Sequence, residues 1–180
     1  MKKTIVNPVI KDTVTFLQTS KETDGKITDL ELTLLPGGGN VIHYHNYSEK
    51  FTAIEGDLGL VYGKKREKMI LRPGESFTIP AMELHNFYNP IDREIKFGIQ
   101  VEPGHQGFEY MLRILYGLAS DGRTDKESKP KSIKNLAIVC VMAELNAPGL
   151  LTLMTPLFRY IYKKAERKGD VQKLVDQYCI

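Results

Sequence analysis

Hydrophobic and polar residues alternate through the first half of the chain in short runs that Gly, Pro, Asn and Asp interrupt. A period of two over four to eight residues is typical of a β-strand that buries one face. The pattern predicts strands at residues 13–18, 27–35, 41–45, 51–55, 58–62, 68–71, 76–80, 84–88 and 95–101. Many short strands at such close spacing indicate a sandwich or a closed barrel.

Two of the interruptions predict tight connections. The charged segment 63–67 lies between two predicted strands and is expected to form the tip of a hairpin. Pro73-Gly74 is expected to form another turn, because both residues favour turn conformations.

Beyond residue 104 the hydrophobic period becomes that of a helix. A first helix is expected from Phe108 to Ala119, ended by Asp121-Gly122. After a polar link, a second helix is expected to start at Ser132, a candidate N-cap, and to reach Leu145.

A third helix is expected from Leu150 to Ala165, kinked or restarted at Pro156 and stopped at Gly169. Asp170 is the candidate cap of a short last helix that reaches Tyr178. The chain therefore divides into a β domain at residues 1–102 and a helical extension at residues 103–180.

The amino-acid composition indicates the broad class of protein to which the chain belongs. The chain has 180 residues, 42% of them hydrophobic and 26% charged, as in folded proteins with one compact domain. The formal net charge of +3 is too small to indicate nucleic-acid binding, and no docking motif is visible. Cys140 and Cys179 have no pairing spacing, so a reducing compartment fits. Because residues 1–12 contain no signal-peptide core, we expect a cytoplasmic location.

Four residues predict a metal site. His43 and His45 are two apart in a β-type run, so both imidazoles are expected on one face. Glu49 follows beyond a short turn, and His85 comes from a distant strand. Imidazoles with one carboxylate suit a divalent transition metal such as Fe, Mn, Zn, Ni or Cu.

The spacing of these residues resembles the two motifs of the cupin superfamily. Gly37, His43, His45, Glu49 and Gly56 match every fixed position of the first motif. The second motif is matched in this chain by Gly74, Pro80, His85 and Asn89, with Met82 where the family usually has glycine. That glycine serves a tight turn before the metal-binding strand, so Met82 either tolerates the turn or reshapes the barrel mouth.

The resemblance covers about half of the chain, and it implies a mainly β fold, a cupin-type jelly-roll barrel (double-stranded β-helix), followed here by helices. It also implies a central metal ion held by His43, His45, Glu49 and His85, and a homodimer as the usual assembly. Cupins include dioxygenases, isomerases, decarboxylases, storage proteins and ligand-sensing domains. In some dioxygenases the glutamate also serves as a general base, which makes Glu49 the candidate catalytic residue.

Strand alternation from the ligands predicts what surrounds the metal. Phe51 and Phe87 are expected to face inward. On the last strand either Phe97 and Ile99 or Lys96 and Gly98 face inward, and the apolar pair is favoured. These rings either line a pocket for a small, partly apolar molecule or belong to the ordinary barrel core. Met82 at the mouth and Tyr47 in the turn between the ligands complete the candidate lining.

The helical extension has three candidate roles. It could cover one barrel mouth, mediate dimerisation, or lie on a membrane through its third helix, whose end is basic. An apolar stripe at helical spacing is most often core or dimer interface, so we do not expect membrane binding. The sequence favours a metal-dependent enzyme of oxygenase or isomerase type on a small organic molecule, with a non-catalytic binding or sensing barrel as the alternative.

Overall fold

The computed structural model describes residues 3–179, apart from the side chains of residues 150 and 151. Within this range the chain forms two antiparallel sheets and four helices. The strands are β1 (Thr4–Asn7), β2 (Asp12–Gln18), β3 (Thr28–Leu34), β4 (Ser48–Glu55), β5 (Leu58–Tyr62), β6 (Glu67–Leu71), β7 (Ser76–Ile79), β8 (His85–Tyr88) and β9 (Ile95–Glu102). The helices are α1 (Gln106–Ser120), α2 (Ile133–Met142), α3 (Leu150–Arg167) and α4 (Asp170–Tyr178).

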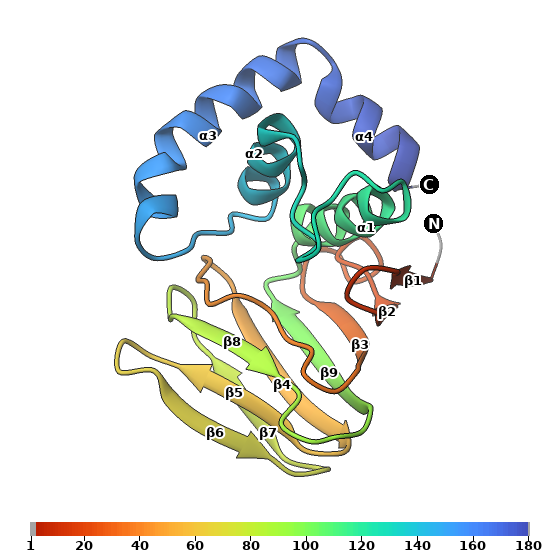
Figure 1. Ribbon diagram of the computed structural model, residues 1–180, viewed down its shortest axis with the longest axis vertical. Coiled ribbons are helices and arrows are strands. Elements are labelled where there is room, and N and C mark those ends of the chain that lie inside the picture. The colour runs from red at the N-terminus through yellow and green to blue at the C-terminus, as the bar shows by residue number, and fades with distance from the viewer. Residues whose placement is uncertain (1–2, 180) are drawn as a thin grey trace.

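The larger sheet has the strand order β1-β2-β3-β9-β4-β7, and the smaller has the order β6-β5-β8. The sheets make up one end of the molecule, and the helices gather at the other end (Figure 1). The inward side chains of both sheets form the core, with Phe51, Phe97 and Leu58 fully buried. The fold is therefore mainly β with a C-terminal helical extension, as the pattern predicted.

Residues 41–45 differ from the prediction, because they do not form a regular strand. The segment makes isolated antiparallel pairs instead, with His43 opposite His85 and Tyr44 opposite Asn146. Earlier in the sequence, Gly39 pairs with Tyr88. The two backbones approach so closely there that a Cβ on residue 39 would lie 2.7 Å from the carbonyl oxygen of Phe87. The segment thus runs tightly along β8 on one side and meets the helical extension on the other.

The predicted turns and helices are largely confirmed. Residues 63–66 connect β5 to β6, with Glu67 already in β6, and Pro73-Gly74 lies in the connection from β6 to β7. Ser132 caps α2, its side chain accepting a hydrogen bond from the Asn135 amide, although α2 ends at Met142 rather than Leu145. Helix α3 continues through Pro156 without a restart.

One predicted helix cap was wrong, and one strand was missed. Asp170 is not the cap of α4, because Gly169 occupies that position with φ of 72°, a left-handed value that glycine adopts without strain. Asp170 lies in the first turn instead, where its carboxylate pairs with Lys134 at 2.7 Å. Strand β1 was not predicted, because its four residues are mostly exposed and show no clear alternation.

Helix α1 joins the extension to the sheets through buried polar contacts. The carboxylate of Glu109 accepts hydrogen bonds from the Thr28 hydroxyl at 2.6 Å and the Ser20 amide at 2.5 Å. The Tyr116 hydroxyl donates to Asp12 at 2.5 Å. None of the helices in the described part of the chain is both long enough and apolar enough to cross a membrane.

Candidate metal centre

The structure brings the four predicted ligands together. His43 and His45 come from the segment before β4, Glu49 from β4 and His85 from the start of β8. All four are buried, and one ligand atom from each lies within 4.8 Å of the others. Two ligands on opposite sides of one transition-metal ion are about 4 Å apart, so a single ion can span the cluster.

The three imidazoles are oriented in the same way. The Nδ1 atoms of His43, His45 and His85 lie 2.9, 2.8 and 2.9 Å from the backbone carbonyl oxygens of Val41, Tyr47 and Glu83. A carbonyl accepts only from a protonated nitrogen, so each ring carries a proton on Nδ1 and directs Nε2 into the cluster. This is the orientation in which metal-binding histidines are commonly held.

The carboxylate of Glu49 lies among these Nε2 atoms. Its Oε2 is 3.0 Å from Nε2 of His85 and 3.5 Å from Nε2 of His45. The buried Nε2 of His45 has no hydrogen-bond partner. A buried polar atom without a partner is costly, and a bound cation would satisfy this one. The donor set therefore fits a divalent transition metal.

The surroundings of His43 and Glu49 favour the protonation states that bind a metal ion, which are the neutral imidazole and the ionised carboxylate. Burial lowers the pKa of His43 to about 4, which keeps its imidazole neutral at pH 7. Burial alone would raise the pKa of Glu49, but the imidazoles of His45 and His85 hold it below its usual value. Burial would lower the pKa of His85, yet its hydrogen bond to Glu49 raises it.

Tyr47 links the cluster to the helical extension. Its ring stacks on His45, with 3.8 Å between the centroids and 12° between the planes. Its buried hydroxyl donates to the carbonyl of Ala143 at the end of α2. On its other side the ring is 4.7 Å from His105. Tyr47 therefore supports a ligand ring from behind.

His105 was matched to no role by the sequence. Its Nδ1 accepts a hydrogen bond from the Phe108 amide at 2.9 Å and so caps α1. Its Nε2 is 3.7 Å from the carboxylate of Glu144. A polar residue just before a predicted helix is the signal that could have identified the cap.

The predicted aromatic lining forms a row beneath the ligands. Ring centroids are 6.2 Å apart from His85 to Phe51, 6.1 Å from Phe51 to Phe87 and 5.1 Å from Phe87 to Phe97. Phe51 and Phe97 are fully buried in the core, whereas Phe87 is half-buried. The rings thus give the cluster an apolar floor.

Met82 and Tyr44 lie on a groove outside the ligands. The groove has a volume of about 760 Å³ and is lined by Tyr44, Met82, Leu84, Pro148, Gly149, Thr152 and Leu153. Tyr44 stands between two ligands in the sequence, and Leu84 directly precedes a third. Tyr44 therefore lies along the groove rather than among the ligands.

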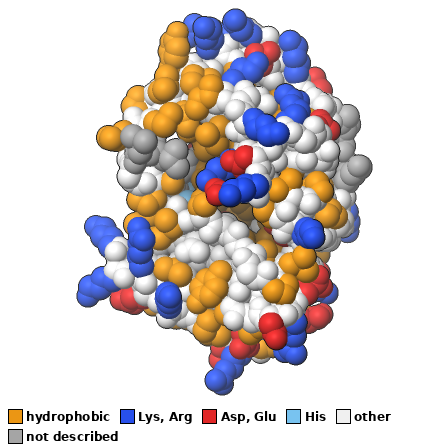
Figure 2. Space-filling view, viewed as in Figure 1, with side chains coloured by type: hydrophobic (Ala, Val, Ile, Leu, Met, Phe, Trp, Pro, Cys, Tyr) orange, Lys and Arg blue, Asp and Glu red, His pale blue; other side chains and the backbone are white. Residues whose placement is uncertain are grey.

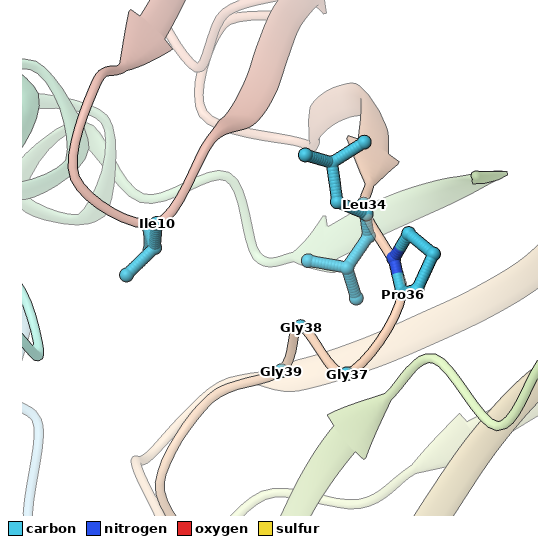
Figure 3. A pocket seen from close by; sticks show the side chains of 7 residues that line it. Ile10, Leu34, Pro36, Gly37, Gly38 and Gly39 are labelled. Atoms are coloured by element: carbon cyan, nitrogen blue, oxygen red, sulfur yellow. The ribbon is translucent and has the colours of Figure 1, made fainter. Parts of the chain in front are cut away.

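A smaller hollow of about 260 Å³ lies elsewhere on the larger sheet. Ile10, in the connection between β1 and β2, and Leu34, at the end of β3, lie along it (Figure 3). Leu35, Pro36 and the three glycines that follow complete its wall. It has no titratable side chain, so we assign it no chemistry.

Comparison with known proteins agrees with this geometry. A family model described as "Cupin domain" matches residues 30–101, a range that contains all four ligands. No curated protein matches the chain. The solved structure of an RmlC-like cupin from Shewanella frigidimarina is similar at a TM-score of 0.50 and 16% identity, over 58% of this chain and 86% of the other.

Two further similar structures differ from each other in their described functions. The polyketide cyclase RemF from Streptomyces resistomycificus shares 23% identity over 51% of this chain, with a TM-score of 0.46, and the match spans 64% of the cyclase. A predicted oxalate decarboxylase from Thermotoga maritima shares 15% identity over 52% of this chain and 81% of its own, with a TM-score of 0.48. The family match at residues 30–101 contains strands β4 to β8, most of β3 and of β9, and the buried ligand cluster, so this segment of the chain is a cupin domain.

Proposed function

We propose that this chain is a metal-dependent enzyme of oxygenase or isomerase type that acts on a small organic molecule. The observation that carries the proposal is the common orientation of His43, His45 and His85, each anchored through Nδ1 with Nε2 directed into the cluster. Core packing alone does not require three buried imidazoles to present the same nitrogen to one carboxylate. It also does not explain why Nε2 of His45 is buried without a partner.

A divalent ion bound by these residues would polarise a substrate oxygen or bring dioxygen into reaction. Fe, Mn, Zn, Ni and Cu all suit three imidazoles and a carboxylate. The backbone carbonyls behind the rings hold them in place, so little reorganisation is needed when substrate binds.

Glu49 is the candidate general base. Its carboxylate is buried and its pKa is held below the usual value, so it is ionised at neutral pH. A base must lie within hydrogen-bond reach of the proton that it takes, and Glu49 faces the same space as the three Nε2 atoms. The apolar floor beneath it, formed by Phe51, Phe87 and Phe97, would exclude water and favours a partly apolar substrate.

Metal analysis of the purified protein tests whether the four ligands bind a metal ion, which the proposed function requires. Wild type is expected to hold about one equivalent of a transition metal, and His45→Ala is expected to lose it. His105→Asn is the matched control, because it changes the histidine outside the cluster and asparagine also caps helices. A metal-free wild type, or equal metal content in wild type and His45→Ala, would refute the proposal.

Catalysis needs a separate measurement. Metal-loaded protein is incubated with a cell metabolite extract, and mass spectrometry follows which small molecules disappear and which appear. Wild type should convert a molecule that Glu49→Gln and His45→Ala leave unchanged. Identical profiles for all three proteins would exclude the enzyme and leave the second candidate.

The second candidate is a non-catalytic binding or sensing barrel. It is favoured by the contact between the ligand segment and the loop after α2, where Tyr44 pairs with Asn146 and Tyr47 donates to Ala143. Through these contacts a change at the metal would reach the helices. Hydrogen exchange at residues 143–149 should then slow when metal is added to the metal-free protein.

A further inference from the structure

Helix α3 presents an apolar stripe to solvent. Leu153, Leu157 and Tyr160 are 76%, 48% and 64% exposed. They are separated by four and three residues, so they lie on one line along the helix. The opposite side of α3 packs against α2, and there Phe158 and Ala165 are buried. The stripe is therefore not the part of α3 that completes the core.

The same line continues into a cluster of cations. Lys164 lies four residues beyond Tyr160, and Lys163, Arg167 and Lys168 surround it, all of them exposed. None of the four takes part in an ion pair with the rest of residues 3–179. Hydrophobic side chains gather over α3 at the upper left of Figure 2, and basic side chains lie along the top.

The charges on α3 distinguish between two partners that could cover the exposed stripe, a second copy of the chain and a lipid surface. The outward line of α3 carries no carboxylate, and the one acidic residue of the helix, Glu166, lies on the side where it interacts with Tyr162. A second copy of the chain that met this one through the same stripe would bring the same cations, and the two sets would repel each other. An anionic lipid surface would supply phosphates for the cations and an apolar layer for the stripe.

We propose that α3 docks the protein on an anionic membrane, with Leu153, Leu157 and Tyr160 inserted at the headgroup boundary and Lys163, Lys164, Arg167 and Lys168 on the phosphates. The stripe also borders the groove beside the ligand segment, since Leu153 lines both. Docking would thus place the mouth of that groove next to the lipid. The sequence-based expectation that the apolar side of this helix is core or dimer interface is confirmed for Phe158 and Ala165, which are buried, and our proposal concerns only the exposed residues.

Vesicle co-sedimentation of the full chain tests the proposal. Binding is expected to vesicles of equal parts phosphatidylcholine and phosphatidylglycerol, and not to pure phosphatidylcholine vesicles. Leu157→Glu should lose binding. Each cation removed should weaken it about fivefold, so Lys164→Gln/Arg167→Gln should weaken it at least tenfold. The exposed pair Lys64→Gln/Lys65→Gln at the β5–β6 tip is the matched control and should bind as wild type does.

Two results would overturn the proposal. Equal weakening by the control pair would mean that any lysine pair contributes and that α3 has no special part. Absence of vesicle binding, together with a dimer in sedimentation velocity that Leu157→Glu dissociates, would assign the stripe to a second copy of the chain. Circular dichroism of each variant checks that its helices remain folded.

Discussion

The backbone amide of Met82 donates a hydrogen bond to the carbonyl of His45 over 2.7 Å, while Met82 itself has a left-handed φ of 66°. The position that is usually glycine in cupins thus keeps its turn in this chain, and the turn ties the second motif to a ligand of the first. The methionine tolerates the conformation rather than reshaping the backbone. Its side chain is 62% exposed, so little packing compensates for the strain.

Met82→Gly should therefore stabilise the protein. A left-handed residue other than glycine costs about 1–2 kcal/mol, and glycine recovers part of this while losing little buried surface. We expect the free energy of unfolding in urea to rise by about 1 kcal/mol. Met82→Val should lower it, because β-branched side chains fit the left-handed region poorly. A stability loss in Met82→Gly would contradict this account of the turn.

Metal should stabilise the folded chain. A ligand that binds only the native state adds about 2.7 kcal/mol at a concentration of 100 times its Kd. We expect the melting temperature of metal-free wild type to rise on addition of metal, and that of His45→Ala to stay the same. His105→Asn should show the wild-type rise, which separates site binding from binding to surface histidines.

The aromatic ring of Tyr47 should contribute more to the stability of the fold than its hydroxyl group does. Tyr47→Phe leaves the Ala143 carbonyl without its donor, which should cost about 1 kcal/mol of stability and leave the metal content unchanged. Tyr47→Ala removes the ring that stacks on His45 and should cost about 3–5 kcal/mol. Urea unfolding of both variants, with metal analysis, measures the difference. Equal losses in the two variants would show that the hydroxyl dominates.

The buried Asp12 should give stability a pH dependence. Burial raises its pKa above 3.8, although the hydrogen bond from Tyr116 opposes part of the rise. The native state then holds this proton more tightly than the unfolded state, so the contribution is present below pH 3.8 and lost as pH rises through the raised pKa. The unfolding free energy of wild type minus that of Asp12→Asn should fall as pH rises from acid to neutral. Urea titrations at several pH values measure it, and a rising difference would refute the assignment.

The sequence predicted most of the local structure because that structure depends on neighbouring residues. Alternation identified β2 to β9, and the two-residue spacing of His43 and His45 was enough to predict that they converge. It did not show that residues 41–45 form isolated pairs rather than a strand. Those pairs involve residues 85 and 146, and contacts at such separation leave no local pattern.

The same limit applies to the helices. The apolar residues of the third helix have the spacing of a buried face, yet only part of that face is covered, because Phe158 and Ala165 are buried and Leu153 and Leu157 are exposed. Periodicity shows that a helix has an apolar side, and only the arrangement of the other helices determines whether that side is covered. The role of His105 as a cap and as a neighbour of Tyr47 was missed for a related reason, since no local pattern joins residues 47 and 105.

Because Tyr44 pairs with Asn146, the cupin domain of this chain depends on the helical extension and is poorly suited to use on its own. Cutting the chain after β9 would remove the partner of Tyr44, the acceptor for Tyr47 and the ring of His105 in one step. The segment that carries two of the ligands would lose its outer support, although every ligand would still be present. A graft of this metal centre onto another scaffold would have to carry the loop after α2 along with it.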